Sequence, residues 1–306
     1  MGPMSDSLDP RAVLAHLGLA DVAAVSPVAG GYSNSAIWRV EPGESDDRVY
    51  ALRLFAAGDE RTFLRERSAM AWVRDQRLPV PVVRATAYVA GRYAMLLDWC
   101  PGRTILDELM LHPDRAWSLG TLMGRAQGRL HRCGAGIDAI EHGNDWISWV
   151  GPDELALQER VRAIRDRYAG PATVLHLDFH PANVLVQSGR ITGMIDWANA
   201  GVGDVRADVA RTDSILRFAP IPPEVAREDV LRLRRVFRRG WRLAHRRVAG
   251  DLPDMDVFEA WALAVMLRDL GAKLYGPDPA TAGVTTADLV PIQHGLSRRK
   301  ARLGIR

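Results

Sequence analysis

Five polar side chains with metal-binding or proton-transfer chemistry lie close together in VLHLDFHPANVLVQSGRITGMIDWAN, residues 174–199. They are His176, Asp178, His180, Asn183 and Asp196. The residues between them are mostly aliphatic and predict two strands that turn back at Ser188–Arg190. Side chains of these types, held around a hairpin, indicate a catalytic or metal-binding site.

The spacing of three of these residues fits phosphoryl transfer from a nucleotide. That reaction needs a divalent cation, usually Mg²⁺, which prefers oxygen ligands, and a group that positions the attacking hydroxyl. Asp178 is the candidate for positioning the hydroxyl or accepting its proton. Asn183, five residues later, and Asp196, at the end of the next strand, are the candidate Mg²⁺ ligands. Protein kinases use the related pattern His-Arg-Asp-x-x-x-x-Asn, followed by Asp-Phe-Gly.

Two other interpretations of this stretch stay open. It could be a polar loop that happens to be rich in turn-forming residues, although five polar positions between apolar strands are not typical of one. His176-x-Asp178-x-His180 could also seat zinc or a dinuclear metal centre, as in a metallohydrolase. That reading leaves Asn183 and Asp196 without a role. In the phosphoryl-transfer interpretation, His176 is a structural residue that holds the loop. His180 is either structural or near the substrate.

The elements that must position these residues fall into two parts. Ahead of the first strand, residues 9–20 predict a short amphipathic helix. Periodicity then predicts the order β, β, α, β, β, with these segments in turn: 26–40, 49–55, 60–77, and two strands within 78–99. After Pro101–Gly102 the pattern is mainly helical, apart from the hairpin. The sequence therefore predicts an α+β protein with a small β-sheet lobe at 1–98 and a larger, mainly helical lobe at 99–306 that carries the candidate catalytic residues.

These motifs resemble those of the aminoglycoside phosphotransferase and choline-kinase-like family, small-molecule kinases with a protein-kinase-like fold. HLDFHPANVLV and GMIDW are similar to the family's catalytic signature, and the likeness runs from about residue 26 to residue 212. It implies a two-lobed kinase fold, ATP or GTP as phosphoryl donor, and Mg²⁺. It also implies that Asp208, in Gly203-Asp204-x-x-x-Asp208, braces the catalytic loop.

The resemblance makes residues 1–98 the nucleotide-binding lobe and residues 99–306 the catalytic, substrate-binding lobe, and it assigns nucleotide-binding residues to the first lobe and to the hinge that follows it. They are Gly30, Gly31, Ser33 and Asn34 in the loop over the nucleotide, Arg53 on the phosphates, Glu66 as the ion-pair partner of Arg53, and Asp98, Trp99 and Cys100 in the hinge that holds the base. Arg53 stands where protein kinases carry Lys, and a guanidinium contacts phosphate differently from an ammonium. Taken alone, Gly30–Gly31 could be a simple hairpin turn, and Arg53 with Glu66 an ordinary surface pair.

Composition limits the classes of protein that fit. The chain has 306 residues, 47% hydrophobic and 25% charged, which is typical of a globular protein with a substantial core. Arginines dominate residues 227–247, but apolar residues recur there at helical spacing, so we expect a solvated amphipathic helix and no nucleic-acid partner. With two cysteines, no signal peptide and no apolar run of about 18 residues, we expect a cytoplasmic protein that does not cross a membrane. A monomer and a weak homodimer are both compatible with the sequence.

The acceptor is the least determined feature. The resemblance implies an antibiotic with a hydroxyl group, an aminoglycoside or a macrolide, and hence a role in resistance. A polycation would need a carboxylate-lined cleft, for which the candidates are Asp251, Asp254, Asp256, Glu259 and Asp269. A macrolide would need an apolar cleft, for which the candidates are Trp241, Trp261, Met266 and Tyr275. All of these could equally be surface or core residues.

Two further functions remain as alternatives to an antibiotic kinase. One is a metabolic kinase of the same fold that acts on choline, homoserine or a sugar. The other is a pseudokinase that binds a nucleotide as a switch without turning it over. The presence of Asp178, Asn183 and Asp196 argues against the pseudokinase, because loss of activity usually removes one of these groups.

Overall fold

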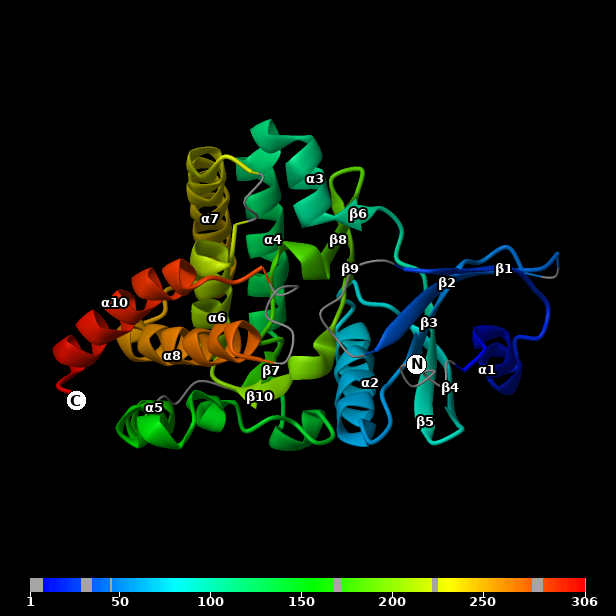
Figure 1. The fold of residues 1–306 in the computed structure, drawn as a ribbon, viewed down its shortest axis with the longest axis horizontal. Helices are drawn as coiled ribbons and strands as arrows, with labels where there is room; N and C mark the ends of the chain where they lie inside the picture. Colours follow the sequence, from blue (N-terminus) through cyan, green and yellow to red (C-terminus); the bar gives the residue numbers. More distant parts are fainter. Residues whose placement is uncertain are drawn as a thin grey trace.

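The chain folds into two lobes that lie side by side (Figure 1). The computed structural model describes residues 8–28, 35–44, 46–167, 172–221, 225–276 and 283–305. A β-sheet lobe is drawn on the right of Figure 1 and a mainly helical lobe on the left. The predicted nucleotide loop, with Gly30, Gly31, Ser33 and Asn34, lies outside the described residues. The predicted α+β architecture, a small sheet lobe followed by a mainly helical lobe, is confirmed.

The first lobe is a five-stranded antiparallel sheet in the order β1-β2-β3-β5-β4. Its elements are α1 (Pro10–His16), β1 (Val22–Pro27), β2 (Ala36–Pro42), β3 (Tyr50–Leu54), α2 (Glu60–Asp75), β4 (Val83–Val89) and β5 (Arg92–Asp98). The sequence pattern does not predict β1, because this edge strand is mostly exposed and lacks a clear hydrophobic alternation. The first helix is shorter than expected, since Gly18 leaves the helical region with φ of 83°.

Strand β3 separates two buried faces of the sheet. Leu52 and Leu54 pack with α1, whereas Phe55 packs with Phe63 of α2. Successive side chains of a strand point to opposite faces. Arg53 therefore projects toward α2 and not toward α1. The two-residue period of the strand is what brings Arg53 to Glu66.

The second lobe is built from helices with short strands between them. Its helices are α3 (Ile105–Leu111), α4 (Ala116–His131), α5 (Leu155–Arg167), α6 (Val205–Phe218), α7 (Arg227–Ala249), α8 (Met255–Leu274) and α10 (Thr286–Leu303). Its strands are β6 (Arg103–Thr104), β7 (Thr173–Leu175), β8 (Val184–Gln187), β9 (Arg190–Met194) and β10 (Gly201–Gly203). The predicted hairpin is the β8–β9 pair. Among the described residues, no helix is both long and apolar enough to cross a bilayer.

Helices α4 and α7 pack unusually closely. A Cβ atom added at Gly120 would lie 2.2 Å from the Phe237 carbonyl oxygen, and one added at Gly124 would lie 2.2 Å from that of Trp241. The two glycines are four residues apart and so lie on one face of α4. The arginine-rich helix α7 buries Phe237 and Trp241 against α4, whereas its Leu231, Val236 and Leu243 are exposed, so the predicted helix is present and its apolar side is only partly covered.

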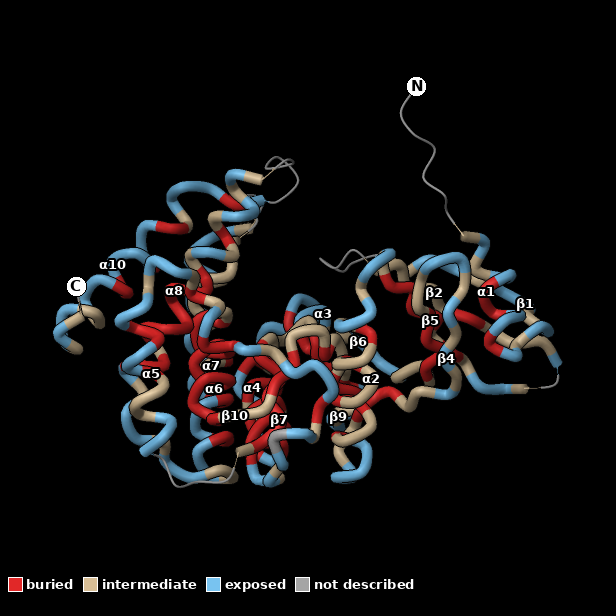
Figure 2. The backbone as a smooth tube through the Cα atoms, turned by 90° about the horizontal axis from the view of Figure 1, so that it is seen from below, coloured by how far each residue is buried: buried red, intermediate tan, exposed pale blue. Residues whose placement is uncertain are grey.

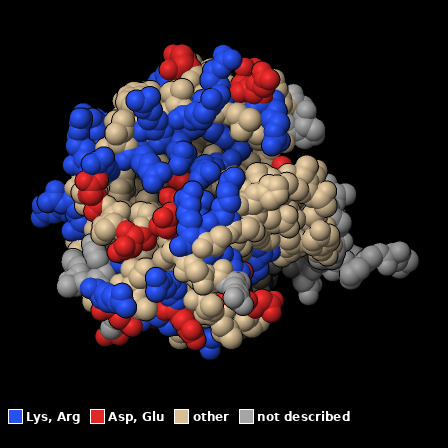
Figure 3. Space-filling model, turned by 90° about the vertical axis from the view of Figure 1, so that its left-hand side faces the viewer, with Lys and Arg blue, Asp and Glu red and all other residues tan. Residues whose placement is uncertain are grey.

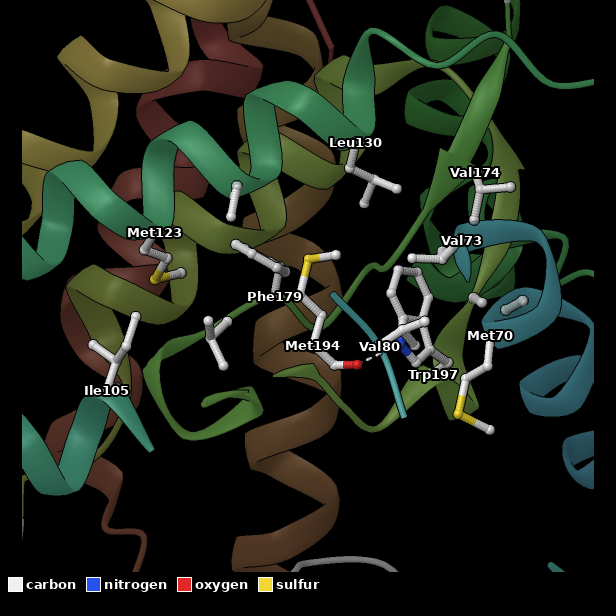
Figure 4. Close-up of a cluster of buried hydrophobic side chains, with 14 of the residues drawn as sticks. Met70, Val73, Val80, Ile105, Met123, Leu130, Val174, Phe179, Met194 and Trp197 are labelled. Carbon is white, nitrogen blue, oxygen red and sulfur yellow. Dashed lines mark hydrogen bonds between the residues drawn. The ribbon is translucent and has the colours of Figure 1, made fainter. Parts of the chain in front are cut away.

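A hydrophobic cluster joins the two lobes beneath the catalytic hairpin (Figure 4). Met70 and Val73 of α2 pack there with Trp197, whose indole N–H donates to the Met194 carbonyl at 2.9 Å. The Met194 amide in turn donates to the carbonyl of Pro79 at 3.0 Å. The end of the hairpin is thereby fixed against the first lobe. Buried segments, drawn in red in Figure 2, occur in both lobes.

Candidate active site

The catalytic loop begins where β7 ends, at Leu175. Leu177 has φ of 61°, a left-handed conformation that is unfavourable for a branched side chain by roughly 1–2 kcal/mol. Its amide donates to Asp208 Oδ1 at 2.6 Å. The strained residue ends the strand and sets the direction in which the next residue, Asp178, leaves the backbone.

Asp178 lies beside His180 and Asn183. The Asn183 Nδ2 group donates to the Asp178 carbonyl at 3.0 Å, and His180 Nε2 lies 3.6 Å from Asp178 Oδ2. About a quarter of the Asp178 side chain is exposed. Burial alone would raise its pKa, but the nearby His180 ring and the Arg211 guanidinium lower it to about 2. At neutral pH the carboxylate is ionised and accessible, as a group that receives a hydroxyl hydrogen must be.

Asn183 and Asp196 are brought together by the β8–β9 hairpin. The Ile195 amide donates to the Asn183 carbonyl at 3.0 Å, just beyond the Val184–Met194 pair. Because the Asn183 amide nitrogen is engaged by Asp178, its Oδ1 atom is the one available as a ligand. Asp196 Oδ1 is buried and has no hydrogen-bond partner among the described residues. An amide oxygen and a carboxylate oxygen of this kind fit a divalent cation such as Mg²⁺.

Arg53, Glu66 and Asp196 form a second group, the Arg53 cluster. Arg53 Nη1 pairs with Glu66 Oε1 at 2.8 Å, and Arg53 Nη2 lies 3.6 Å from Asp196 Oδ1. Burial raises the pKa of Glu66 to about 7, even though Arg53 favours its ionised form. Arg53 Nε and Nη2 are buried and lack hydrogen-bond partners among the described residues. Two such unpaired donors beside an aspartate fit an anionic phosphate with its cation.

His176 does not face a metal site. Its Nε2 atom bonds to the Ile195 carbonyl at 2.9 Å, and its ring packs against Phe179 and Trp197. The side chain is fully buried, and burial lowers its pKa. Within the described parts of the chain, no group of three or more His, Cys, Asp or Glu side chains is arranged to hold a metal. His176 lies where the structural role predicted from the sequence would place it.

Behind the loop, six buried side chains form what we call the Asp208 network: Gln127, His131, Asp208, Thr212, Trp241 and His245. Asp208 Oδ2 accepts from His131 Nε2 at 2.8 Å and from Gln127 Nε2 at 3.2 Å. His131 Nδ1 bonds to His245 Nε2 at 2.9 Å. Burial by itself would raise the pKa of Asp208, but the His131 bond and the Leu177 amide lower it on balance.

The rest of this network reaches the other end of the loop. Thr212 Oγ1 donates to the Phe179 carbonyl at 2.9 Å, and Gln127 Oε1 accepts from Trp241 Nε1 at 2.8 Å. The loop is therefore held at Leu177 and at Phe179, on both sides of Asp178. The bracing position predicted for Asp208 is the position that it occupies.

The hinge residues are engaged within the first lobe. The Asp98 carboxylate binds Arg84 through two bonds of 2.6 and 2.7 Å. The amides of Asp98 and Trp99 donate to the carbonyls of Val82 and Val49. Cys100 is partly buried, and burial raises the pKa of its thiol to about 11. The N–H groups of Asp98 and Trp99 are thus used by the sheet, and a base at this hinge would need other donors.

Most of the candidate acceptor carboxylates already have arginine partners. The pairs are Asp251 with Arg246, Asp254 with Arg206, Glu259 with Arg242 and Arg299, and Asp269 with Arg211 and Arg268. Asp256 lies exposed in the first turn of α8. Lys and Arg side chains also gather across the upper part of the helical face in Figure 3.

The aromatic candidates do not form an apolar cleft. Trp241 and Trp261 are completely buried and Met266 is nearly so, within the packed cores of the helical lobe. Tyr275 is exposed at the end of α8. Of the two interpretations that the sequence left open for these residues, the core position holds for Trp241, Trp261 and Met266, because helix packing uses them to fill the core.

Sequence reasoning missed Arg211, which reaches the carbonyl of Leu177, and also Gln127, His131 and His245. The signal for Arg211 is its position three residues after Asp208 on the same helix, which places both on one face. The other three come from α4 and α7, far from the motif in the sequence. Only the close packing of those two helices brings them to Asp208.

Comparison with known proteins identifies the family to which the chain belongs. The sequence profile described as "Phosphotransferase enzyme family" matches residues 24–249. The chain belongs to this family. The enzyme class predicted from the sequence, a phosphotransferase with an alcohol acceptor, is the class that this family represents, and the resemblance inferred from the motifs is confirmed.

Solved structures of antibiotic kinases share the fold. An amicoumacin kinase in complex with AMP-PNP, Ca²⁺ and Ami has a TM-score of 0.63 at 13% identity, over 96% of this chain and 94% of that one. A thermostable mutant of aminoglycoside phosphotransferase APH(4)-Ia has a TM-score of 0.62 at 18% identity, over 95% and 98% of the two chains. APH(3'')-Id from Streptomyces rimosus ATCC10970 has a TM-score of 0.54 at 19% identity, over 83% and 94%. Likeness at these identities establishes the fold.

A sequence relative is also found among curated proteins. The uncharacterized protein YcbJ of Bacillus subtilis (strain 168) is 33% identical over 64 residues. The match covers 21% of this chain and 17% of that protein. It therefore says nothing about most of either chain.

Proposed function

We propose that this protein transfers the γ-phosphoryl group of ATP or GTP to a hydroxyl group of a small molecule, and that this acceptor is an antibiotic. The observation that carries the proposal is an ionised, accessible Asp178 beside Asn183, with the unsatisfied Arg53 cluster next to them. A resistance role, a cytoplasmic location and a monomer or weak homodimer remain predictions from the sequence.

Asp178 supplies the chemistry at the acceptor. Its carboxylate accepts a hydrogen bond from the attacking hydroxyl and so fixes the direction of that oxygen. A carboxylate with a pKa of about 2 is a weak base, so its main contribution is orientation. It takes the proton only as the new O–P bond forms and the hydroxyl becomes acidic.

Arg53 supplies the charge at the donor. Its unpaired Nε and Nη2 groups are suited to the α- and β-phosphates, with Glu66 fixing the guanidinium in place. Asn183 and Asp196 would hold Mg²⁺. When bound, this ion offsets the charge of the phosphate oxygens. The sequence resemblance further assigns the cover of the nucleotide to Gly30–Asn34, which lie outside the described residues, and the binding of the base to Asp98–Cys100.

Proteins with the same fold support the choice of an antibiotic as acceptor. One of them is described as an amicoumacin kinase, and another as a complex with ADP and hygromycin B. Aminoglycosides and macrolides are the acceptors that we expect from the sequence resemblance. Because most of the carboxylates suited to a polycation are paired with arginine, and the aromatic macrolide candidates are buried or exposed at a helix end, other hydroxylated antibiotics belong in the same test.

The test is nucleotide consumption by the purified protein. ATP and GTP are each offered with aminoglycosides, macrolides, other hydroxylated antibiotics, choline, homoserine and sugars, with Asp178→Asn as the matched control. We expect turnover with one acceptor class and a loss of about 10²–10⁴-fold in kcat in the variant. Nucleotide affinity should be unchanged, because Asp178 does not contact the phosphates in this mechanism.

Other outcomes separate the alternatives. Turnover with choline, homoserine or a sugar would identify a metabolic kinase of the same fold. Tight nucleotide binding without turnover of any acceptor would favour the nucleotide-binding switch. Full activity of Asp178→Asn would overturn the mechanism itself.

A further inference from the structure

Arg211 is a buried cation next to the catalytic loop that the proposed mechanism does not use. It lies on α6, about one helical turn after Asp208, and only 5% of it is exposed. Its Nε atom donates to the Leu177 carbonyl at 3.4 Å, and its Nη2 atom donates to Asp269 Oδ2 at 3.2 Å. Arg211 therefore connects the loop to α8.

Both backbone polar groups of Leu177, its amide and its carbonyl, are hydrogen-bonded to side chains of α6. Its amide is bound by Asp208 and its carbonyl by Arg211, so both polar groups of this left-handed residue are fixed by side chains of α6. The Leu177 carbonyl belongs to the peptide bond that leads into Asp178. Rotation of that peptide would move the Asp178 carboxylate, so its orientation depends on the carbonyl bond as well as the amide bond.

The charge of Arg211 is also close to the reaction centre. It is one of the groups that stabilise the ionised form of Asp178, together with His180 and His176. Arg211 Nη1 is buried and has no hydrogen-bond partner among the described residues. A buried cation that keeps an unpaired donor is costly, so a benefit elsewhere has to offset that cost.

We propose that Arg211 is a positioning residue for phosphoryl transfer, which fixes the Leu177–Asp178 peptide bond from its carbonyl side and ties it to α8 through Asp269. This inference rests on the proposed function. It extends the bracing by Asp208, which acts only on the amide side of Leu177. Loss of Arg211 leaves Asp208, Asn183 and the Arg53 cluster in place while the peptide before Asp178 becomes free to rotate.

Arg268→Met is the matched control for Arg211→Met. Arg268 pairs with the same carboxylate, Asp269, but it lies on α8, its side chain is 46% exposed, and its contacts are to Asp269 and the Trp149 carbonyl, away from the catalytic loop. Asp269→Asn is a second variant that keeps the side-chain volume and weakens only the far end of the link. Arg211→Lys keeps the charge but cannot reach both partners with one planar group.

The experiment combines steady-state kinetics with amide hydrogen exchange of the segment 174–183 in the resting protein. For Arg211→Met we expect kcat to fall by at least about tenfold, with the KM for nucleotide changed by less than about twofold. The loop amides should exchange faster in this variant. In both kcat and loop exchange, Asp269→Asn and Arg211→Lys should lie between Arg211→Met and the wild type. Arg268→Met should match the wild type in both.

The two readouts make the outcomes decisive. Unchanged loop exchange in Arg211→Met overturns the positioning role, and so does an equal loss of activity in Arg268→Met. If the wild type transfers no phosphoryl group to any acceptor, the proposed function fails, while faster loop exchange in Arg211→Met still supports the positional link. If Arg211→Met does not fold, Arg211→Lys and Asp269→Asn decide the question by the same comparison.

Discussion

The Asp208 network and the Arg53 cluster are both buried, both charged and both next to the reaction centre, but they differ in how their polar atoms are satisfied. In the network, both oxygens of Asp208, both nitrogens of His131 and both amide atoms of Gln127 have partners. In the cluster, Arg53 and Glu66 share one bond and leave atoms unpaired.

We interpret this difference as a difference in role: the Asp208 network supports the loop, and the Arg53 cluster binds a ligand. A buried polar atom without a partner costs about 1–3 kcal/mol, so a benefit has to offset that cost, and a ligand that completes the atom is one such benefit. The satisfied network holds the loop in one conformation whether or not a substrate is present. In the proposed function, the unsatisfied cluster receives a phosphate and its cation. Substitutions in the first should therefore cost stability, and those in the second should cost affinity.

The largest expected effect is on the network side. Asp208→Ala removes a buried carboxylate and leaves the Leu177 amide, His131 and Gln127 without an acceptor, so we expect a loss of about 3–5 kcal/mol in the free energy of unfolding. Chemical denaturation measures this directly. Asp251→Ala, which removes an exposed carboxylate, is the control and should stay within about 0.5 kcal/mol of the wild type. A similarly small effect at Asp208 would show that the network is not what supports the loop.

A second test uses pH and His245. Burial, followed by repulsion from His131, lowers the pKa of His245 to about 3. The unfolded chain takes up a proton below its ordinary pKa of about 6.5, whereas the folded protein does not. Stability from this group is therefore complete above pH 6.5 and declines as the pH falls toward 3.

His245→Gln keeps a donor for His131 but does not titrate. Relative to this variant, the wild type should lose about 2 kcal/mol of unfolding free energy between pH 6.5 and pH 4.5. Urea denaturation of both proteins across this range gives the comparison. If the unfolding free energy of the two proteins changes with pH in the same way, His245 is not held neutral in the folded state.

The smallest effect on stability is expected in the Arg53 cluster. Arg53→Met leaves Glu66 buried, but a carboxyl with a pKa of about 7 can take up a proton and stay neutral. We expect a loss of nucleotide affinity of about 10–100-fold, from one or two charge-assisted bonds, and a change in unfolding free energy near 1 kcal/mol at pH 7. Calorimetric titration with ATP and Mg²⁺, with Arg53→Lys as the control, checks this. Unchanged affinity would remove Arg53 from the nucleotide site.

The sequence predicts some features of this site well, and the reason is local. The hairpin in the residue pattern suffices to bring Asn183 and Asp196 to one end, because this relation depends on short-range geometry. The pairing of Arg53 with Glu66 comes instead from the resemblance to the kinase family, and the structure places the two side chains in contact. The edge strand β1 and the early end of the first helix are missed for the opposite reason, since exposed edges and single glycines leave little pattern.

Residue type and spacing alone determined the two-lobed fold, the order of the elements around the hairpin, and which carboxylates and amides could take part in phosphoryl transfer. The tertiary structure decided the rest. It placed His131 and His245 behind Asp208 through the glycine-mediated contact of α4 and α7, set Arg211 on the Leu177 carbonyl, and paired most of the acceptor-side carboxylates with arginines. These outcomes depend on contacts between segments about 35 to 115 residues apart in the sequence. No local periodicity encodes such contacts, because the burial and pairing of side chains so far apart in the sequence are determined only when the helices pack.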